Sequence, residues 1–140
     1  MIAKRCGLIR ERISVALDGE SFVTELLPLP APNISEWPHT WRWESRAACA
    51  EEILQGRIER LRELYKRSAP EYVLCYGRTY WGHFRSLFDA TRFEPALDGA
   101  VLVGRTGGSN IVLTPFLSQR VGFGYDLIRP IAQVLAQWPI

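Results

Sequence analysis

The chain has 140 residues, of which 47% are hydrophobic and 23% are charged. This composition is typical of one folded soluble domain and excludes a disordered tail or a collagen-like repeat. A chain of this length buries roughly two thirds of the surface that its unfolded form exposes, so it can build a core without metal or disulfides. It is too short for two full domains, and we expect a single domain over residues 1–140.

The charge balance excludes a strong electrostatic attraction of nucleic acid by the chain as a whole. There are 17 Lys and Arg residues against 15 Asp and Glu, which gives a formal net charge of +2. Any contact with DNA must therefore be local. Of the 17 basic residues 15 are Arg, whose forked guanidinium suits phosphate or carboxylate, although a genome rich in G and C produces the same bias.

The cysteines indicate a reducing compartment. Cys6, Cys49 and Cys75 are odd in number, far apart and not in a C-x-x-C arrangement, which argues against a disulfide framework or a metal site. No apolar run reaches the roughly 18 residues of a membrane span. We expect a cytoplasmic protein with no membrane association, no metal and no cofactor.

The first part of the chain allows two interpretations. Residues 8–17 carry a helical stripe, but Ile13, Val15 and Leu17 also alternate as in the first strand of a hairpin, before the turn pair Asp18-Gly19. We favour a helix followed by a strand over 22–27. That strand must end at Pro28, because proline removes a backbone donor.

The middle of the chain carries the clearest helical signal. Three tryptophans fall within residues 36–43, in a stretch with neither helical nor strand period, and the helical stripe that follows covers residues 45–68. The helix ends before Pro70. Residues 72–76 are apolar throughout, as in a strand covered on both faces of a parallel sheet.

The second half of the chain alternates strands and helices. A short helix follows Gly77-Arg78, with Thr79 as its expected cap. Residues 100–103 and 111–114 are strand-like and form a hairpin or lie apart in one sheet. A last helix over 127–138 places Pro130 in its first turn, where proline is tolerated. Together these elements predict an α/β fold, a three-layer sandwich whose central sheet is mostly parallel and flanked by helices.

In such folds ligands bind at the carboxyl ends of the strands. The loop after Leu27 leads to Trp37, which either offers a stacking platform for a base or locks a long connection against the sheet. The loop after the second strand, at Tyr76, Gly77 and Arg78, places backbone amides and a guanidinium where they can hold phosphate, although a plain turn also needs that glycine.

The loop after the last strand mixes hydroxyl, amide, apolar and basic side chains. Its candidate binding residues are Thr114, Phe116, Leu117, Ser118 and Arg120. An apolar side chain beside an arginine can wedge into a base step while the arginine grips phosphate, and a bare surface loop is the alternative.

Catalytic constellations are scarce in the sequence. There is no G-x-S-x-G or H-E-x-x-H pattern, and no G-x-G-x-x-G or P-loop pattern for a nucleotide cofactor. Glu25 is the one acid inside a predicted strand and beside a candidate loop, which makes it the general base favoured by position. The alternative is that Glu25 pairs with an arginine.

Several of these segments resemble the uracil-DNA glycosylase superfamily, in particular its uncharacterised bacterial branch. The resemblance covers about residues 22–138 and rests on four features. These are a strand ending in Leu26-Leu27-Pro28-Leu29-Pro30, a long helix, the run Pro70-Glu71-Tyr72-Val73-Leu74-Cys75-Tyr76-Gly77-Arg78 before Trp81-x-x-Phe84, and a strand ending in Leu113-Thr114-Pro115-Phe116.

The resemblance implies a uracil-DNA glycosylase-like domain in which a base is flipped into a pocket, stacked, read on its edge and cleaved by an activated water. Two departures weaken the cleavage step. The family's early strand-end loop, which activates water, has no counterpart here, and we expect this sequence to begin after it. Phe116 stands near the place of the family's histidine, which stabilises the departing base.

We therefore expect a nucleic-acid or nucleobase-binding protein whose partner is single- or double-stranded DNA, and for which base excision lacks two of its usual groups. The alternative is an interaction or vestigial protein that self-associates as a homodimer. In that case a second copy covers an exposed sheet edge or apolar patch.

Overall fold

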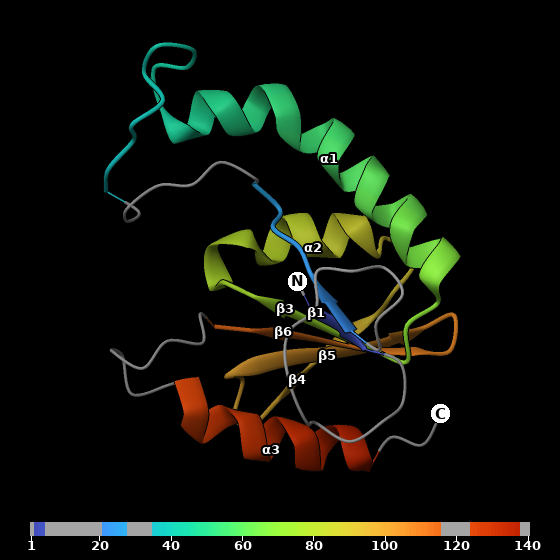
Figure 1. Ribbon diagram of the computed structural model, residues 1–140. Helices are drawn as coiled ribbons and strands as arrows, with labels where there is room; N and C mark the ends of the chain where they lie inside the picture. Colours follow the sequence, from blue (N-terminus) through green and yellow to red (C-terminus); the bar gives the residue numbers. More distant parts are fainter. Residues whose placement is uncertain (1, 5–20, 28–34, 116–123, 138–140) are drawn as a thin grey trace.

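The computed structural model describes residues 2–4, 21–27, 35–115 and 124–137. These residues form an α/β fold around a six-stranded sheet in the order β2-β1-β3-β6-β5-β4. The strands are β1 (Ile2–Lys4), β2 (Ser21–Val23), β3 (Tyr72–Tyr76), β4 (Phe93–Ala96), β5 (Val101–Thr106) and β6 (Ser109–Thr114). The helices are α1 (Arg46–Ser68), a 3₁₀ turn η1 (Arg78–Tyr80), α2 (Trp81–Leu87) and α3 (Gly124–Ala136). Helices α1 and α2 lie over one face of the sheet and α3 lies over the other (Figure 1).

The sheet is mixed, so the predicted mostly parallel sheet is wrong. Among the described strands only β3 and β6 pair in parallel, and the other neighbours are antiparallel. For β5 and β6 the physical reason is the short connection between them. Gly107 and Gly108 both have positive φ, 55° and 83°, which is the backbone of a tight hairpin turn and leaves no room for a crossover helix.

Helix α1 forms where its sequence pattern predicts. The Ser45 hydroxyl accepts a hydrogen bond from the Ala48 amide at 3.1 Å and caps the first turn. Leu54, Ile58 and Leu61 are buried along one face, so the helix is held to the sheet by an apolar stripe. It ends at Ala69, which adopts the left-handed conformation with φ 40°.

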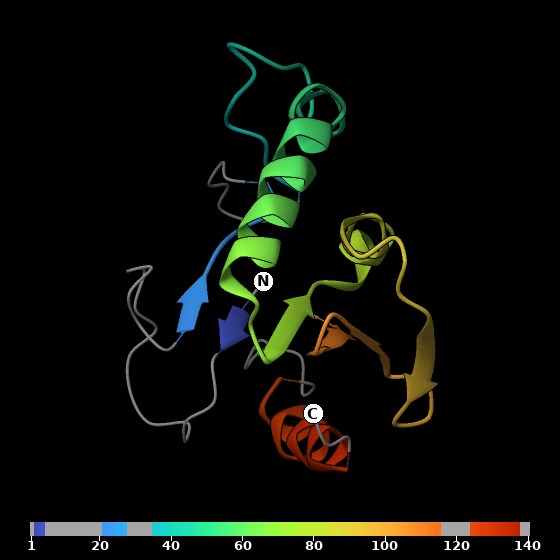
Figure 2. The same ribbon diagram turned by 90° about the vertical axis from the view of Figure 1, so that its right-hand side faces the viewer.

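Two apolar clusters lie on the two faces of the sheet. Val73, Cys75, Ile111 and Leu113 belong to the larger one, which also takes in the buried stripes of α1 and α2. Val101, Val103, Val112 and Ile131 form the smaller one beneath α3. Successive residues of β6 therefore face opposite clusters, as the strand period of two requires. Figure 2 shows the sheet between these helices.

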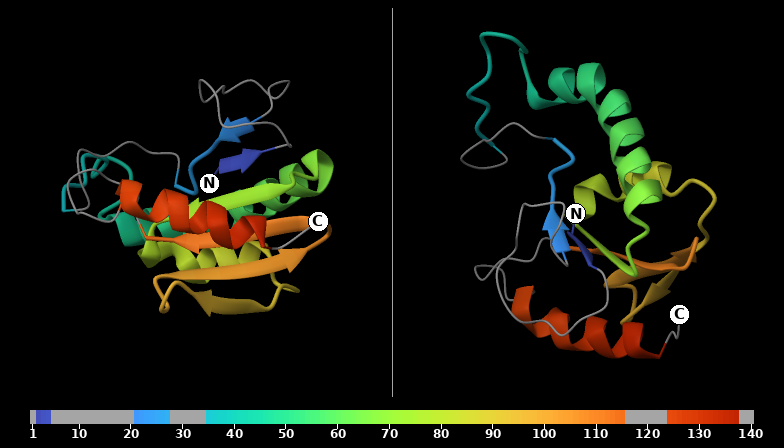
Figure 3. Two further views of the ribbon diagram at one scale, coloured as in Figure 1. Left: turned by 90° about the horizontal axis from the view of Figure 1, so that it is seen from below. Right: turned by 45° about the vertical axis from the view of Figure 1, so that its right-hand side comes forward.

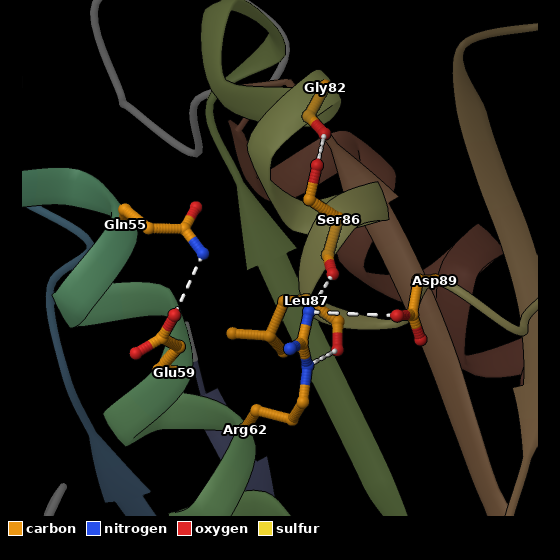
Figure 4. Close-up of polar contacts among 7 residues, drawn as sticks. All are labelled: Gln55, Glu59, Arg62, Gly82, Ser86, Leu87 and Asp89. Carbon is orange, nitrogen blue, oxygen red and sulfur yellow. Dashed lines mark hydrogen bonds and ion pairs between the residues drawn. The ribbon is translucent and has the colours of Figure 1, made fainter. Parts of the chain in front are cut away.

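Helices α1 and α2 are fastened to each other by Arg62. Its guanidinium donates to the carbonyl oxygens of Ser86 at 2.5 Å and Leu87 at 3.4 Å, and it lies 3.8 Å from the Asp89 carboxylate. These acceptors stand at the carboxyl end of α2, where the helix dipole favours a cation. Figure 4 shows this contact.

Three predictions at element boundaries are wrong. The strand predicted over 22–27 ends at Val23, and Leu26 and Leu27 leave the sheet and enter the core. Thr79 does not cap α2, because η1 intervenes and no side chain caps either element. Pro130 lies in the interior of α3 rather than in its first turn, because the helix begins at Gly124.

Two strands escape the sequence patterns. β1 has three residues and β4 has four, with a proline inside it, so neither is long enough to show alternation. The helix or hairpin predicted over residues 8–17 lies outside the described residues. The two possible arrangements of 100–103 and 111–114 resolve to a hairpin, because β5 and β6 pair antiparallel.

Gly104 is required by the close approach of β4 to β5. A Cβ at this position would lie 2.7 Å from the Thr91 Cγ2 atom and 2.9 Å from the Phe93 ring. We expect Gly104→Ala to lower the free energy of unfolding by about 1 to 3 kcal/mol, because the packed ring and methyl must move.

Gly56→Ala is the matched control, since nothing lies within 4 Å of its added Cβ. In the interior of α1 that change should raise stability by about 0.5 to 1 kcal/mol. Denaturant titration measures both, and equal effects would contradict this packing.

Candidate functional site

Three strands end at the same edge of the sheet. Val23 of β2 and Leu74 of β3 both pair with Ile2 of β1, and Tyr76 of β3 pairs with Thr114 of β6. Because β1 runs antiparallel to both of its neighbours, β2, β3 and β6 all run in one direction (Figure 3). The chain therefore leaves all three strands from one edge, as the sequence predicts, although the sheet is mixed.

The Thr114 carbonyl fixes the turn after β3. It accepts hydrogen bonds from the Gly77 amide at 2.9 Å and from the Trp81 indole nitrogen at 3.1 Å. Gly77 has a φ of 106°. Residues with a Cβ atom rarely adopt this conformation, so glycine is required there. The end of β6 is thus joined to the start of α2 through one oxygen atom.

Arg78 stands at the mouth of this turn. Its guanidinium carbon lies 5.0 Å from the centre of the Trp81 ring, and one of its nitrogens donates to the Gly99 carbonyl at 3.3 Å. Stacking on an indole leaves the other N–H donors of a guanidinium available. The side chain is exposed, so these donors can meet a phosphate or the edge of a base.

Glu25 and Tyr76 interact across the same edge. Tyr76 is half-buried, and burial raises the pKa of its hydroxyl, with a further rise from the negative charge of Glu25. Arg57 donates to the backbone carbonyl of Glu25 at 2.8 Å. Among the described residues the Glu25 carboxylate forms no ion pair with an arginine. Glu25 lies two residues beyond β2, not inside a strand.

Trp37 locks a connection instead of offering a free face. Its indole nitrogen donates to the Trp43 carbonyl at 2.9 Å, and the Arg46 guanidinium lies 5.3 Å from its ring centre. The ring packs against the core cluster under α1. The structure thus places Trp37 with the segment before α1 and gives it no contact with the turn at Gly77.

Sequence reasoning missed the partners that hold this tryptophan segment. Glu52 accepts hydrogen bonds from the Trp43 indole at 2.7 Å and from Arg42 at 2.9 Å. These bonds, the one from Trp43 first, lower the pKa of the Glu52 carboxyl. The signal was present in the sequence, because a carboxylate in the second turn of a helix faces the residues that precede the helix. Trp41 is left 79% exposed.

Most of the predicted third loop lies beyond the part of the chain that the structure describes. Phe116, Leu117, Ser118 and Arg120 lie outside the described residues. The structure therefore brings together Glu25, Tyr76, Gly77, Arg78 and Thr114 from the predicted set, and it adds Trp81. We call this group the strand-end site.

The described residues restrict the chemistry in other ways. Burial raises the pKa of the Cys75 thiol to about 12, so it is not a thiolate nucleophile near neutral pH. Within the described ranges no group of three or more His, Cys, Asp or Glu side chains could hold a metal ion. No helix of the described part is both long and apolar enough for a bilayer crossing.

Comparisons of the chain with protein-family models, with curated proteins and with solved structures give no match.

The coupling between Glu25 and Tyr76 is testable by titration. We expect Glu25→Gln to lower the pKa of Tyr76, because the substitution removes a negative charge that opposes formation of the phenolate. Titration of ring-labelled tyrosine by NMR measures this, with a Tyr76→Phe variant to assign the signal. Glu94→Gln, on β4, is the control and should leave Tyr76 unchanged. An unchanged Tyr76 pKa in Glu25→Gln would place the two side chains apart.

Proposed function

We propose that the protein binds nucleic acid by receiving a base and its phosphate at the strand-end site. The observation that carries this proposal is the side-by-side ending of β3 and β6 at Tyr76 and Thr114, with the Arg78 guanidinium stacked on Trp81 beside them. An aromatic surface, a phosphate-binding fork and a rigid turn are the parts that base recognition needs.

Each part has a distinct task in this proposal. Tyr76 is half-buried and offers aromatic surface next to a polar rim. The Trp81 ring packs against the core cluster and holds the Arg78 guanidinium in place. Arg78 is held at two points and can turn its remaining donors to a phosphate. The Thr114 carbonyl is already committed to two donors, so it fixes the turn and does not bind the ligand.

The charge of the chain fits local binding. A formal net charge of +2 gives little long-range attraction, so affinity must come from a few arginines in contact with phosphate. Several arginines are committed elsewhere, including Arg42 to Glu52 and Arg62 to the end of α2. Arg78 makes no ion pair within the described residues and remains open to a ligand.

We also propose that the fold is a uracil-DNA glycosylase-like sandwich, that the protein is cytoplasmic and that DNA is its partner. Helices on both faces of the sheet and three strands that end at one edge support it. Glu25 is the acid that the strand-end site offers for activating water, and its charge acts on Tyr76. We place base binding first, because the group that would stabilise a departing base has no candidate among these residues.

The homodimer alternative finds little support at the β4 edge of the sheet. Pro95 lies inside β4, and Glu94 beside it is exposed. Proline and charge on an edge strand oppose pairing with a second copy.

We expect Arg78→Ala to weaken binding of a single-stranded oligonucleotide about tenfold, because a charge-assisted contact to phosphate is lost. The slope of log affinity against log salt concentration should fall by about 0.7, the share of one phosphate contact on a single strand. Fluorescence anisotropy across a salt series measures both. Arg92→Ala is the matched control, since Arg92 has an 89% exposed side chain and lies beside β4.

Equal binding by the Arg78 and Arg92 variants would contradict the assignment of Arg78. Incubation of the purified protein with oligonucleotides that carry uracil or other altered bases, in single and double strands, tests excision separately. Release of a base, together with its loss in Glu25→Gln, would show that the protein is an enzyme and not only a binding protein.

A further inference from the structure

A basic surface lies along α1, next to the segment that carries Glu25. A cavity of about 360 Å³ runs between α1 and the segment that follows β2, and we call it the arginine groove. Its polar lining comes from Thr24, Arg57, Arg60, Glu63 and Arg67. Figure 2 shows the segment after β2 passing alongside α1.

The groove is strongly biased in charge. Three guanidinium groups line it against a single carboxylate, that of Glu63. Arg57, Arg60 and Arg67 are spaced by three and seven residues, so they share one side of α1 and extend over about 15 Å of its length. Their alignment produces a positive strip on a chain that is nearly neutral overall.

Two of these arginines have no structural task in the described part of the chain. Arg60 and Arg67 are exposed and form no ion pair with any described residue, whereas Arg42, Arg62 and Arg92 each face a carboxylate. Like charges along one helix face cost stability unless a counter-ion neutralises them. An anionic ligand in the groove would remove that cost.

Arg57 connects the groove to the strand-end site. Its guanidinium donates to the Thr24 hydroxyl and to the Glu25 carbonyl, both at 2.8 Å. Arg57 therefore lies between Glu25 of the strand-end site and the other two arginines of the groove, Arg60 and Arg67. A polyanionic chain that extends from the strand-end site past Glu25 would reach the arginine groove.

We propose that the arginine groove binds the phosphodiester backbone of the single strand whose base occupies the strand-end site. This inference rests on the proposed function. A row of forked cations suits repeated phosphates better than a single small anion, because each guanidinium can hold its own phosphate. Basic grooves of this kind track the backbone of single strands without reading the sequence.

The test compares two double variants that remove the same charge. The double variant Arg60→Gln, Arg67→Gln removes the two groove arginines that form no ion pair among the described residues. It keeps Arg57, whose hydrogen bonds to Thr24 and Glu25 support the fold. Arg92→Gln with Arg105→Gln removes two exposed arginines from the β4–β5 side of the sheet. The probe is a single-stranded oligodeoxynucleotide of about 12 nucleotides, within the range of known single-strand site sizes.

We expect the groove variant to bind this probe about tenfold more weakly than the control variant. Its salt slope should be smaller by about 1.4, the share of two phosphates on a single strand. Glu63→Gln should act in the opposite direction and tighten binding, because it removes the only carboxylate of the groove lining. A probe of the same sequence with neutral methylphosphonate linkages should bind the groove variant and the wild type equally.

Equal binding and equal salt slopes in the two double variants, with normal binding by the wild type, would overturn the groove and leave the strand-end site standing. Absence of binding by the wild type would overturn both. Circular dichroism and denaturant titration of the double variants establish that they are folded, and both sets of substitutions lie on exposed side chains.

Discussion

The parallel pairing of β3 with β6 is the constraint on which the rest of the structure depends. Val73 and Cys75 of β3 and Ile111 and Leu113 of β6 are buried together in the cluster under α1 and α2. A slip of β3 by one residue would turn Val73 and Cys75 to the opposite face of the sheet. This register brings the ends of both strands to one edge. Gly77 then extends the pairing by one more hydrogen bond, to the Thr114 carbonyl.

A nearly neutral chain can still present local positive charge if some of its arginines pair with carboxylates and carbonyl oxygens and others do not. Arg62 is used to fasten α2 to α1, and Arg42 is used to hold Glu52. Arg78 and the free arginines of the groove keep donors for a ligand. Surface ion pairs contribute little to stability, so under the proposed function these arginines matter more for where an anion binds than for how strongly the chain folds.

The sequence predicted the elements that carry strong local periodicity. Helix α1 and strand β3 have long or fully apolar patterns, and both formed where expected. The direction of most strands was not predictable in the same way, because pairing is decided by connection length and by distant neighbours. Strands of three or four residues, such as β1 and β4, carry too little pattern to be seen.

The same limit applied to the candidate site. Tyr76, Gly77 and Arg78 were predicted as site residues because they lie at the end of a clear strand. The stacking of Arg78 on Trp81 could not be predicted in this way, because it depends on the η1 turn. The arginines of the groove lie on the solvent side of a helix, where charge is ordinary, and only the segment after β2 turns them into a lining.

The most direct measurement is amide chemical-shift mapping of the labelled protein during titration with a single-stranded oligonucleotide. If the carboxyl edge of β3 and β6 receives the base, the shifts of residues 76–81 and of Thr114 should change together and saturate with one affinity. Changes confined to the opposite edge or to the β4–β5 side, or no changes at all, would contradict nucleic-acid binding at this edge.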